Sequence, residues 1–317
     1  MKAIIIEQFG GTDQLKYADR PKPQPAAHEL LIRNVAISVN PVDAKIRANG
    51  TWAGIPLPAV LGYDAAGVVE AVGEQVQDFR VGDEVFYTPQ IHGNIHGTYA
   101  EFTPVPAAFV AHKPRGISFE EAAAIPLAGG TAWEAIVRRL QIKPGETVLI
   151  TAAAGGVGSF AVQFARAAGA RVIAMASERN HEFLKLVGVD FVVDYHRSDA
   201  HQQILEYTGG ELIDAAFDIQ GNPVIGGILD LVKPFGRLAC ILPPAGNLAP
   251  LYHHNQTLYG IFLTRERKRL QEMTPLFEWG KVKAWVDEAL PFSVENICKA
   301  HERMDQAHGR GKIVLTF

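Results

Sequence analysis

The spacing of apolar residues changes along the chain, and the change falls near residue 118. Before this point, short apolar runs are separated by turns rich in Gly, Pro and charged residues, which is typical of antiparallel strands. The pattern Ser118-Phe119-Glu120-Glu121 is a capping box and predicts a helix over 120–124. The apolar runs cover residues 2–6, 29–39, 66–72, 84–87 and 98–105.

Strand and helix patterns alternate from residue 123 to residue 258. Such alternation predicts right-handed βαβ crossovers and a parallel sheet covered on both faces. Strands are predicted at 147–151, 171–177, 191–194, 213–218 and 237–242. Helices are predicted at 131–140, 157–168, 180–187, 199–207 and 223–232. The last part of the chain is predicted to hold helices at 265–279 and 294–307 and a strand at 312–315.

Composition and charge narrow the class of protein. The 317 residues are 48% hydrophobic, and 30 Lys and Arg stand against 34 Asp and Glu, a net charge of −4. A chain of this length buries a sizeable core without disulfides. Without a basic excess, we expect no nucleic-acid partner and no electrostatic membrane anchor. The charge-free stretch 147–165 contains three glycines, so it is predicted as strand, turn and helix rather than as a membrane span.

Only two cysteines occur, Cys240 and Cys298. They are too few for a disulfide framework, and no Cys-x-x-Cys pair exists to hold a structural zinc. The N-terminal apolar run is too short for a signal peptide. These features together predict a cytoplasmic protein.

The segment from Thr151 to Gly158 lies between a predicted strand and a predicted helix, where a dinucleotide fingerprint belongs. Its spacing is that of G-x-G-x-x-G, with alanine at the first glycine. The second glycine allows the backbone to approach a pyrophosphate, and the helix N-terminus attracts the anion. The alternative is a tight strand–helix turn without a ligand. The residues predicted to bind the cofactor here are Ala154, Gly155, Gly156, Val157 and Gly158.

The residues after the second strand of this unit bear on the choice of cofactor. NAD-binding folds usually place a carboxylate there to hold the ribose diol, but Ala176 and Ser177 occupy the expected positions. Ser177 and Arg179 suit a 2′-phosphate instead, which favours NADP(H). Glu178 leaves NAD(H) open, because an inward-turned carboxylate would bind the diol.

Five motifs resemble the medium-chain dehydrogenase/reductase family over essentially the whole chain. They are Asn40-Pro41-Val42-Asp43, Leu61-Gly62-Tyr63-Asp64, Val81-Gly82-Asp83-Glu84-Val85, Ala153-Ala154-Gly155-Gly156-Val157-Gly158 and Gly311-Lys312-Ile313-Val314-Leu315. Within the family, the sequence is most similar to the zinc-independent quinone oxidoreductases related to ζ-crystallin. The resemblance implies an α/β fold, with a Rossmann-type doubly wound parallel sheet inserted in a mainly antiparallel, GroES-like catalytic domain.

In this arrangement, residues 1–122 and 259–317 form the catalytic domain and residues 123–258 form the dinucleotide-binding domain. The active site is expected in the cleft where the domains meet, beside the carboxyl ends of the strands. The strand at 237–242 is a candidate sheet edge, and a bare apolar edge favours pairing with a second copy. By analogy with the family, we expect a homodimer.

The residues at the family's catalytic zinc positions predict that no metal is bound. Where alcohol dehydrogenases have a cysteine, a histidine and a third ligand, this sequence has Asn40, Tyr63 and Leu127. These side chains offer no set of deprotonated nitrogen or sulfur ligands. His92 and His96 lie in a glycine-rich segment, where two solvent-facing loop histidines are favoured over a ligand pair.

Hydride transfer without a metal favours acceptors that delocalise the resulting negative charge. A saturated ketone develops an alkoxide, whereas a quinone or an enone develops a phenolate or an enolate, which needs less stabilisation. The predicted function is an NADPH-dependent, metal-independent oxidoreductase that reduces a quinone or an α,β-unsaturated carbonyl. The alternatives are an enoyl-thioester reductase, a zinc-type alcohol dehydrogenase-like enzyme, and a crystallin-like NADPH-binding protein.

Three residues are candidates for the substrate side of the site. Asn40 is predicted to donate to the substrate oxygen or to organise the nicotinamide ribose. Tyr63 is either a second polar contact or a packing ring. The resemblance places Trp52 against a flat substrate, with a lid-packing role as the alternative. It also places Thr131, at the start of the helix 131–140, near the nicotinamide, and Tyr195 near the adenosine ribose or phosphate.

Overall fold

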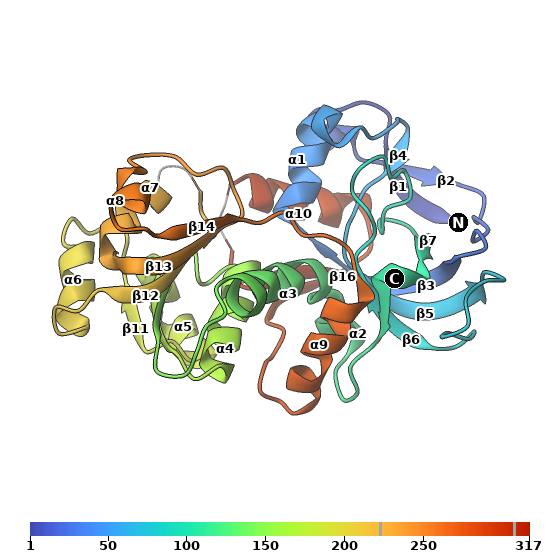
Figure 1. The fold of residues 1–317 in the computed structure, drawn as a ribbon. Coiled ribbons are helices and arrows are strands. Elements are labelled where there is room, and N and C mark those ends of the chain that lie inside the picture. Colours follow the sequence, from blue (N-terminus) through green and yellow to red (C-terminus); the bar gives the residue numbers. More distant parts are fainter. Residues whose placement is uncertain (222–223, 307–308) are drawn as a thin grey trace. The chain divides into compact units, whose positions relative to one another are not determined.

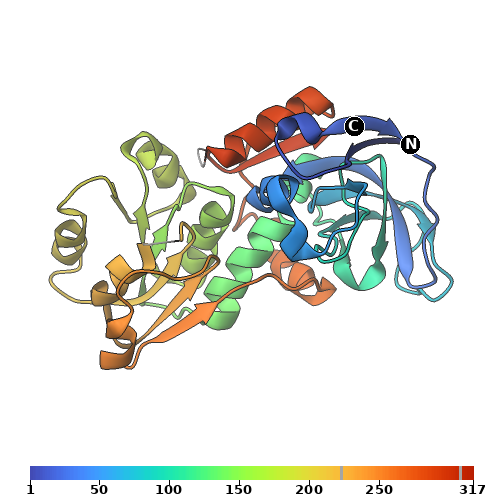
Figure 2. The same ribbon diagram turned by 90° about the horizontal axis from the view of Figure 1, so that it is seen from above.

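The structure is a computed structural model that describes residues 1–221, 224–306 and 309–317. The chain folds into two compact units, one of residues 1–128 and 264–317 and the other of residues 129–263. Figures 1 and 2 show the elements of each unit from two directions. Within the described part of the chain, no helix combines the length and the apolar character needed to cross a membrane.

Seven strands form the main sheet of the first unit. They are β3 (Glu29–Val39), β5 (Ala65–Val72), β6 (Glu84–Tyr87), β7 (Phe102–Pro106), β8 (Val110–His112), β15 (Val286–Pro291) and β16 (Lys312–Thr316). Their order is β15-β16-β3-β5-β6-β8, and β7 also pairs with β3. All pairs are antiparallel except β15 with β16. A smaller antiparallel sheet has the order β2-β1-β4 and consists of β1 (Lys2–Ile6), β2 (Lys16–Asp19) and β4 (Ala59–Val60).

The C-terminal strand β16 lies between β15 and β3 in this sheet. In the register of β16 on β3, Ile313 lies opposite Val39. This pairing brings Lys312 to Asn40, although 272 residues separate them in the sequence. The topology therefore places a basic residue from the end of the chain beside one of the predicted site residues.

Among the described residues, four helices belong to the first unit alone: α1 (Pro41–Asn49), α2 (Phe119–Ala123), α9 (Arg267–Glu278) and α10 (Val294–Asp305). A fifth, α3 (Pro126–Trp133), runs from the first unit into the second. The capping box predicted for α2 is present, since Ser118 Oγ accepts from the Glu121 N–H at 3.2 Å and the Glu121 carboxylate accepts from the Ser118 N–H at 2.9 Å. Short 3₁₀ turns occur at η1 (Thr12–Gln14), η2 (Thr51–Ala53) and η3 (Ala107–Phe109).

Six parallel strands form the sheet of the second unit. They are β9 (Thr147–Thr151), β10 (Arg171–Met175), β11 (Phe191–Val193), β12 (Ile213–Asp218), β13 (Val232–Cys240) and β14 (Thr257–Gly260). Their order is β11-β10-β9-β12-β13-β14. The helical segments are η4 (Glu134–Arg139, a π-helix), α4 (Gly156–Ala167), η5 (Glu178–Asn180), α5 (His181–Val187), α6 (Ala200–Tyr207), α7 (Val224–Ile228), η6 (Leu229–Leu231) and α8 (Ala249–His253). This is the doubly wound parallel sheet that the sequence predicts.

The prediction of a sheet edge at 237–242 is wrong. These residues belong mostly to β13, which pairs with β12 on one side and with β14 on the other. The edge strand is β14, which the sequence pattern did not indicate because it is only four residues long and lies among turn residues. Any pairing with a second copy through this end of the sheet would therefore use β14.

Some predicted helices differ from those in the structure. Thr131 does not open a helix: α3 already begins at Pro126, and the chain continues as the π-helix η4 rather than as an α-helix to residue 140. In the predicted helix 223–232, Pro223 lies outside the described residues, and α7 gives way to a 3₁₀ turn and then to β13 at Val232. Two glycines, Gly226 and Gly227, weaken a longer helix there. In the predicted helix 294–307, α10 ends at Asp305, and residue 307 lies outside the described residues.

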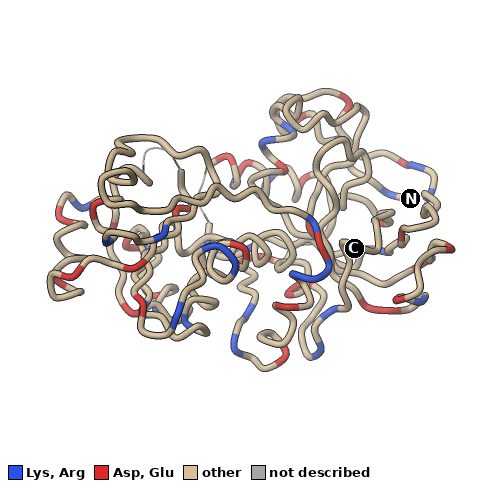
Figure 3. Tube along the Cα trace, in the orientation of Figure 1, with Lys and Arg blue, Asp and Glu red and all other residues tan. Residues whose placement is uncertain are grey.

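Positive and negative residues are nearly equal in number and are distributed over both units. Figure 3 shows Lys and Arg interspersed with Asp and Glu along the trace of both units. Many of these side chains form local ion pairs, such as Arg197 with Asp199 at 2.9 Å. Exposed pairs of this kind contribute little to stability. Buried charged residues, such as Asp64 and Lys312, are more informative.

Candidate active site

The dinucleotide fingerprint, residues 151–158, forms a tight turn between β9 and α4, the phosphate turn. Ala152 adopts a left-handed conformation with φ +46°, and the Gly155 N–H donates to the Ala152 carbonyl oxygen at 3.1 Å, which closes the turn. Gly155 is the N-cap of α4 and has no side chain to occupy the first N–H groups of the helix. These N–H groups and the helix dipole are therefore left for an anion.

Gly158 lies where α4 passes closest to this turn. A Cβ at Gly158 would lie 2.5 Å from the Ala152 carbonyl oxygen and 2.6 Å from Ala153 Cα, so a side chain fits only if the backbone moves. A Cβ at Gly155 would meet only the Ala152 oxygen, at 3.4 Å. Gly158 thus permits close packing of the helix, whereas the backbone at Gly155 is open. The other predicted cofactor residues lie beside them, Ala154 in the turn and Gly156 and Val157 in the first turn of α4.

Ser177 and Arg179 lie in the loop after β10, at the same end of the sheet as the phosphate turn. The Ser177 hydroxyl accepts from Asn180 Nδ2 at 3.3 Å. The Arg179 and Glu178 side chains are exposed. Residues suited to either cofactor therefore lie at this end of the sheet. The hydroxyl and the guanidinium suit the 2′-phosphate of NADP(H), and the carboxylate of Glu178 suits the ribose diol of NAD(H).

Asp194 is a carboxylate in this region that sequence reasoning missed. It accepts from the His196 N–H at 2.9 Å and from the Glu178 N–H at 3.1 Å. The hydrogen bond from His196, with that from Glu178, lowers the pKa of Asp194. Asp194 thereby joins the loop after β10 to the loop after β11. Tyr195 follows it, 41% exposed, with its ring 4.2 Å from that of His196.

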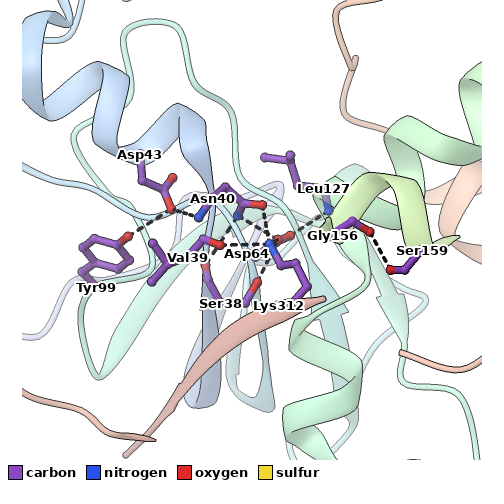
Figure 4. Close-up of polar contacts among 10 residues, drawn as sticks. All are labelled: Ser38, Val39, Asn40, Asp43, Asp64, Tyr99, Leu127, Gly156, Ser159 and Lys312. Carbon is purple, nitrogen blue, oxygen red and sulfur yellow. Dashed lines mark hydrogen bonds and ion pairs between the residues drawn. The ribbon is translucent and has the colours of Figure 1, made fainter. Parts of the chain in front are cut away.

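In the first unit, a buried network of hydrogen bonds surrounds Asp64 (Figure 4). One carboxylate oxygen of Asp64 accepts from the Ser38 hydroxyl at 3.0 Å and from Asn40 Nδ2 at 2.9 Å. The other accepts from the Leu127 N–H at 2.7 Å. Lys312 Nζ lies 3.4 Å from the same carboxylate. Asp64 is fully buried, and these donors compensate the loss of its hydration.

The network fixes the side chain of Asn40, which is 2% exposed. Its Nδ2 donates to Asp64, and its Oδ1 accepts from Lys312 Nζ, so the orientation of the amide is determined at both ends. A second Nδ2 contact, with the Ser38 carbonyl, is long at 3.5 Å. Lys312 also donates to the Val39 carbonyl at 3.0 Å. Asn40 is therefore held between a buried acid and a buried base.

Burial acts in opposite directions on these two ionisable groups. It raises the pKa of Asp64, while Lys312 and the hydrogen bond from Asn40 act to lower it. It lowers the pKa of Lys312, while Asp64 and Asp43 act to raise it. Each charge thus makes burial of the other tolerable, and removing either one leaves its partner without compensation.

A second buried group of polar side chains lies around Asp43. The Asp43 carboxylate accepts from the Asn40 N–H at 2.8 Å and from the Tyr99 hydroxyl at 3.0 Å. The same hydroxyl lies 2.9 Å from His301 Nε2 on α10. Burial raises the pKa of Asp43 to about 7 and lowers the pKa of His301 to about 3. Tyr63 is also fully buried, its hydroxyl has no hydrogen-bond partner among the described residues, and burial raises its pKa.

Trp52, His96 and Thr131 have different surroundings. Trp52 is in η2, 47% exposed, with its ring edge-on to His92 at 5.8 Å. His96 forms a β-bridge with Val60, and burial lowers its pKa. Thr131 is buried within α3. The structure thus brings together Asn40 and the backbone of Leu127, which both bond to Asp64.

No group of three or more His, Cys, Asp and Glu side chains in the described part of the chain is arranged to hold a metal ion. At the positions that correspond to zinc ligands in the family, the structure has the engaged amide of Asn40, the buried phenol of Tyr63 and the backbone of Leu127. None of these is a deprotonated nitrogen or sulfur ligand. The residues of the phosphate turn, in contrast, fit a dinucleotide, because the turn is open at Gly155 and closed by small residues elsewhere.

Sequence reasoning missed Ser38, Asp64 and Lys312 as members of the network. Asp64 and Lys312 both stood within motifs that carried the family resemblance, Leu61-Gly62-Tyr63-Asp64 and Gly311-Lys312-Ile313-Val314-Leu315. A charged residue inside an otherwise apolar motif was the available signal, because such a residue is rarely buried unless it is paired. The identity of its partner was not readable, since the pairing depends on β16 lying beside β3.

Comparison with known proteins agrees with this architecture. Residues 26–115 match the alcohol dehydrogenase GroES-like domain, and residues 156–279 match the zinc-binding dehydrogenase family. The NADPH-dependent alkenal/one oxidoreductase of Arabidopsis thaliana chloroplasts is 33% identical, over 99% of this chain and 79% of its own length. A quinone oxidoreductase of Pseudomonas aeruginosa is 32% identical over 99% of both chains.

A solved structure shows the same fold over the full length. The quinone oxidoreductase from Coxiella burnetii superposes with a TM-score of 0.88 at 30% identity, covering 100% of this chain and 99% of its own. The match includes both the antiparallel GroES-like unit and the parallel unit that carries the phosphate turn. The chain therefore belongs to the medium-chain dehydrogenase/reductase superfamily, in its quinone oxidoreductase branch, and is an oxidoreductase that binds a nicotinamide dinucleotide.

Proposed function

We propose that this protein transfers hydride from NADPH to a quinone or an α,β-unsaturated carbonyl compound without a catalytic metal. The observation that carries the proposal is the environment of Asn40, where a buried amide held by Asp64 and Lys312 takes the place of a zinc ligand. The relatives named quinone oxidoreductase and alkenal/one oxidoreductase support the class of acceptor.

The bound dinucleotide supplies the hydride. The open backbone at Gly155 and the N-terminus of α4 would bind its phosphates. Ser177, Arg179 and Tyr195 are proposed to contact the 2′-phosphate of NADPH, because a hydroxyl, a guanidinium and a phenol are suitable donors to a phosphate. Thr131 is proposed to lie near the nicotinamide.

Asn40 is proposed to donate a hydrogen bond to the substrate oxygen or to the nicotinamide ribose. One Nδ2 hydrogen is committed to Asp64, but the contact of the other with the Ser38 carbonyl, at 3.5 Å, is at the limit of hydrogen bonding. The bond from the Lys312 ammonium to Asn40 Oδ1 polarises the amide and strengthens its N–H as a donor. A single such donor suits an enolate or a phenolate, whose charge is delocalised.

The other two substrate-side candidates differ in exposure. Trp52 is 47% exposed, so its ring is available to stack on a flat acceptor. Tyr63 is fully buried in the apolar core of the first unit, which favours its role as a packing ring. No exposed acid lies beside Asn40 in the network described, so we propose that water protonates the reduced acceptor.

The cellular compartment is also part of the proposal. Both cysteines are free, Cys240 buried and Cys298 partly exposed. Proteins that keep thiols without disulfides are typical of reducing compartments. We therefore propose a cytoplasmic enzyme.

Steady-state turnover of chelator-treated protein tests the proposal. NADPH oxidation would be followed with an ortho-quinone, methyl vinyl ketone, crotonyl-coenzyme A and cyclohexanone, and repeated with NADH. We expect turnover with the first two acceptors, a lower KM for NADPH than for NADH, and none with the saturated ketone. Turnover that appears only after zinc is added, or only with the thioester, would contradict the proposal. Binding of NADPH without turnover on any acceptor would favour the non-catalytic alternative.

A further inference from the structure

The phosphate turn is fastened to a second loop by the side chain of Thr151, the last residue of β9. Its hydroxyl donates to Asp218 Oδ1 at 2.7 Å and accepts from the Ile219 N–H at 2.9 Å. Thr151 and Asp218 are buried, with 0% and 1% of their surface exposed. One hydroxyl thus joins the end of β9 to the loop that follows β12.

Asp218 organises that loop. Its Oδ1 accepts from the Gln220 N–H at 3.1 Å and from the Gly221 N–H at 3.3 Å, in addition to the Thr151 hydroxyl. Three donors therefore converge on a single buried oxygen. The carboxyl group fixes the backbone of the first residues after β12 and, through Thr151, ties them to the neighbouring strand.

The place of this contact in the sheet is informative. β9 and β12 are neighbours, and the chain proceeds from β9 to β10 and β11 on one side before it returns to β12 on the other. In open parallel sheets, ligands bind beyond the carboxyl ends of the strands at the point where the strand order reverses. The bond between Thr151 and Asp218 spans this point.

The turn that begins after Thr151 has a strained backbone that other contacts must stabilise. Ala152 has a left-handed backbone at φ +46°, which costs a residue other than glycine about 1 kcal/mol or more. The bond from Gly155 N–H to the Ala152 carbonyl fixes the far side of the turn. The Thr151 side chain fixes the near side, because the hydrogen bonds of its hydroxyl reach across to β12 and its loop.

We propose that Thr151 and Asp218 are a positioning pair that holds the dinucleotide site in its binding conformation before the cofactor arrives. The inference rests on the proposed function only for the identity of the ligand, a nicotinamide dinucleotide. Neither side chain needs to contact the cofactor. Loss of the pair makes the turn more mobile, so binding must then order it. The effect is therefore expected in the affinity and KM for NADPH rather than in kcat.

Substitutions within β9 provide the test. Thr151→Val removes the hydroxyl and keeps the shape, and Thr151→Ser restores a hydroxyl. Thr147→Val is the matched control, because Thr147 lies at the other end of the same strand and is also buried, at 3% exposure. The Kd for NADPH would be measured by calorimetry on the full chain. Amide hydrogen exchange of residues 152–158 would be measured without ligand, together with KM and kcat.

We expect Thr151→Val to raise the Kd for NADPH about tenfold, because the hydrogen bonds of the hydroxyl with Asp218 and Ile219 are lost. Exchange at Gly155 should become faster in the ligand-free protein, Thr151→Ser should recover most of the affinity, and Thr147→Val should behave as wild type. Unchanged affinity in Thr151→Val, or equal weakening in Thr147→Val, would overturn the positioning pair. If Thr151→Val does not fold, Thr151→Cys keeps the bulk with a weak donor and should change in the same direction.

The two proposals fail in different ways. Wild-type protein that binds neither NADPH nor NADH would overturn the proposed function and this inference with it. If the wild type binds NADPH and Thr151→Val binds it with the same affinity, only the proposal of a positioning pair is overturned. The calorimetric titration of the wild type therefore comes first.

Discussion

At the scale of single residues, the site depends on charges that are buried and paired. Asp64 and Lys312 have almost no exposed surface, and each compensates the other while both fix the amide of Asn40. The sequence predicted a role for Asn40 from its motif. It did not identify the two charges behind it, because 248 residues separate Asp64 from Lys312 and their contact exists only in the folded sheet.

Replacing one member of the Asp64–Lys312 pair should reduce stability more than expected from replacing both. Lys312→Met leaves a buried carboxylate without its cation, and we expect a loss of about 3 kcal/mol in the free energy of unfolding. Asp64→Asn leaves the ammonium unpaired with a similar result. The double variant should lose clearly less than the sum of the two. Urea unfolding of the three variants measures this coupling, and strictly additive losses would show that the charges do not act as a pair.

The choice of cofactor also belongs to single residues. Arg179→Gln removes the guanidinium proposed to contact the 2′-phosphate, so the KM for NADPH should rise about tenfold while the KM for NADH changes little. Arg171→Gln, a substitution at an exposed arginine at the start of β10, is the matched control. A rise in KM for both cofactors, or for neither, would contradict the assignment of Arg179.

At the scale of elements, what could be predicted divides into local and non-local features. The phosphate turn was predictable, because its glycine spacing lies within one strand–turn–helix segment. The edge of the parallel sheet was not, because the order of strands depends on crossovers, and the short strand β14 covers β13. Likewise, Thr131 fell inside a helix rather than at its start, since α3 begins at Pro126 and the preceding residues carry no strong N-terminal signal.

A buried histidine on helix α10 makes the stability of the fold depend on pH. His301 on α10 is fully buried and bonds to Tyr99, and burial lowers its pKa to about 3. The folded protein therefore excludes a proton that the unfolded chain binds below about pH 6.5. Stability contributed by the neutral imidazole is present above that pH and is lost as the pH falls toward the folded pKa.

We expect wild type to lose stability relative to His301→Gln as the pH falls from about 6 to 4, at about 1.4 kcal/mol per pH unit. Urea unfolding at several pH values measures the difference between the two proteins. His201→Gln, which changes an exposed histidine in α6, serves as control and should follow wild type. Parallel curves for wild type and His301→Gln would mean that the imidazole is not held neutral.

At the scale of the whole molecule, the exposed edge of the parallel sheet bears on assembly. The Ile261 N–H donates to the Cys240 carbonyl on β13, so by strand alternation the backbone of Leu258 faces away from β13. Exposed aromatic side chains lie near this edge in the sequence, Tyr252 at 86% and Phe262 at 57%. An edge with free backbone groups and apolar neighbours favours pairing with a second copy.

The expected homodimer would use this edge. Sedimentation at micromolar concentration should show a dimer for the wild type and a monomer for Leu258→Pro, which removes an outward N–H donor and leaves the bonds to β13 in place. Circular dichroism controls for folding of the variant. A monomeric wild type, or a dimer unchanged by Leu258→Pro, would contradict pairing through β14.

One unit contains the phosphate turn, and the other contains a polar network in place of zinc ligands. The most direct test of hydride transfer without a metal uses chelator-treated enzyme, methyl vinyl ketone and NADPH deuterated at C4 on either face. Mass spectrometry of the product should show one deuterium at the β-carbon with one of the two cofactors. Absence of deuterium from the product with both, or transfer only after zinc is restored, would contradict the central claim.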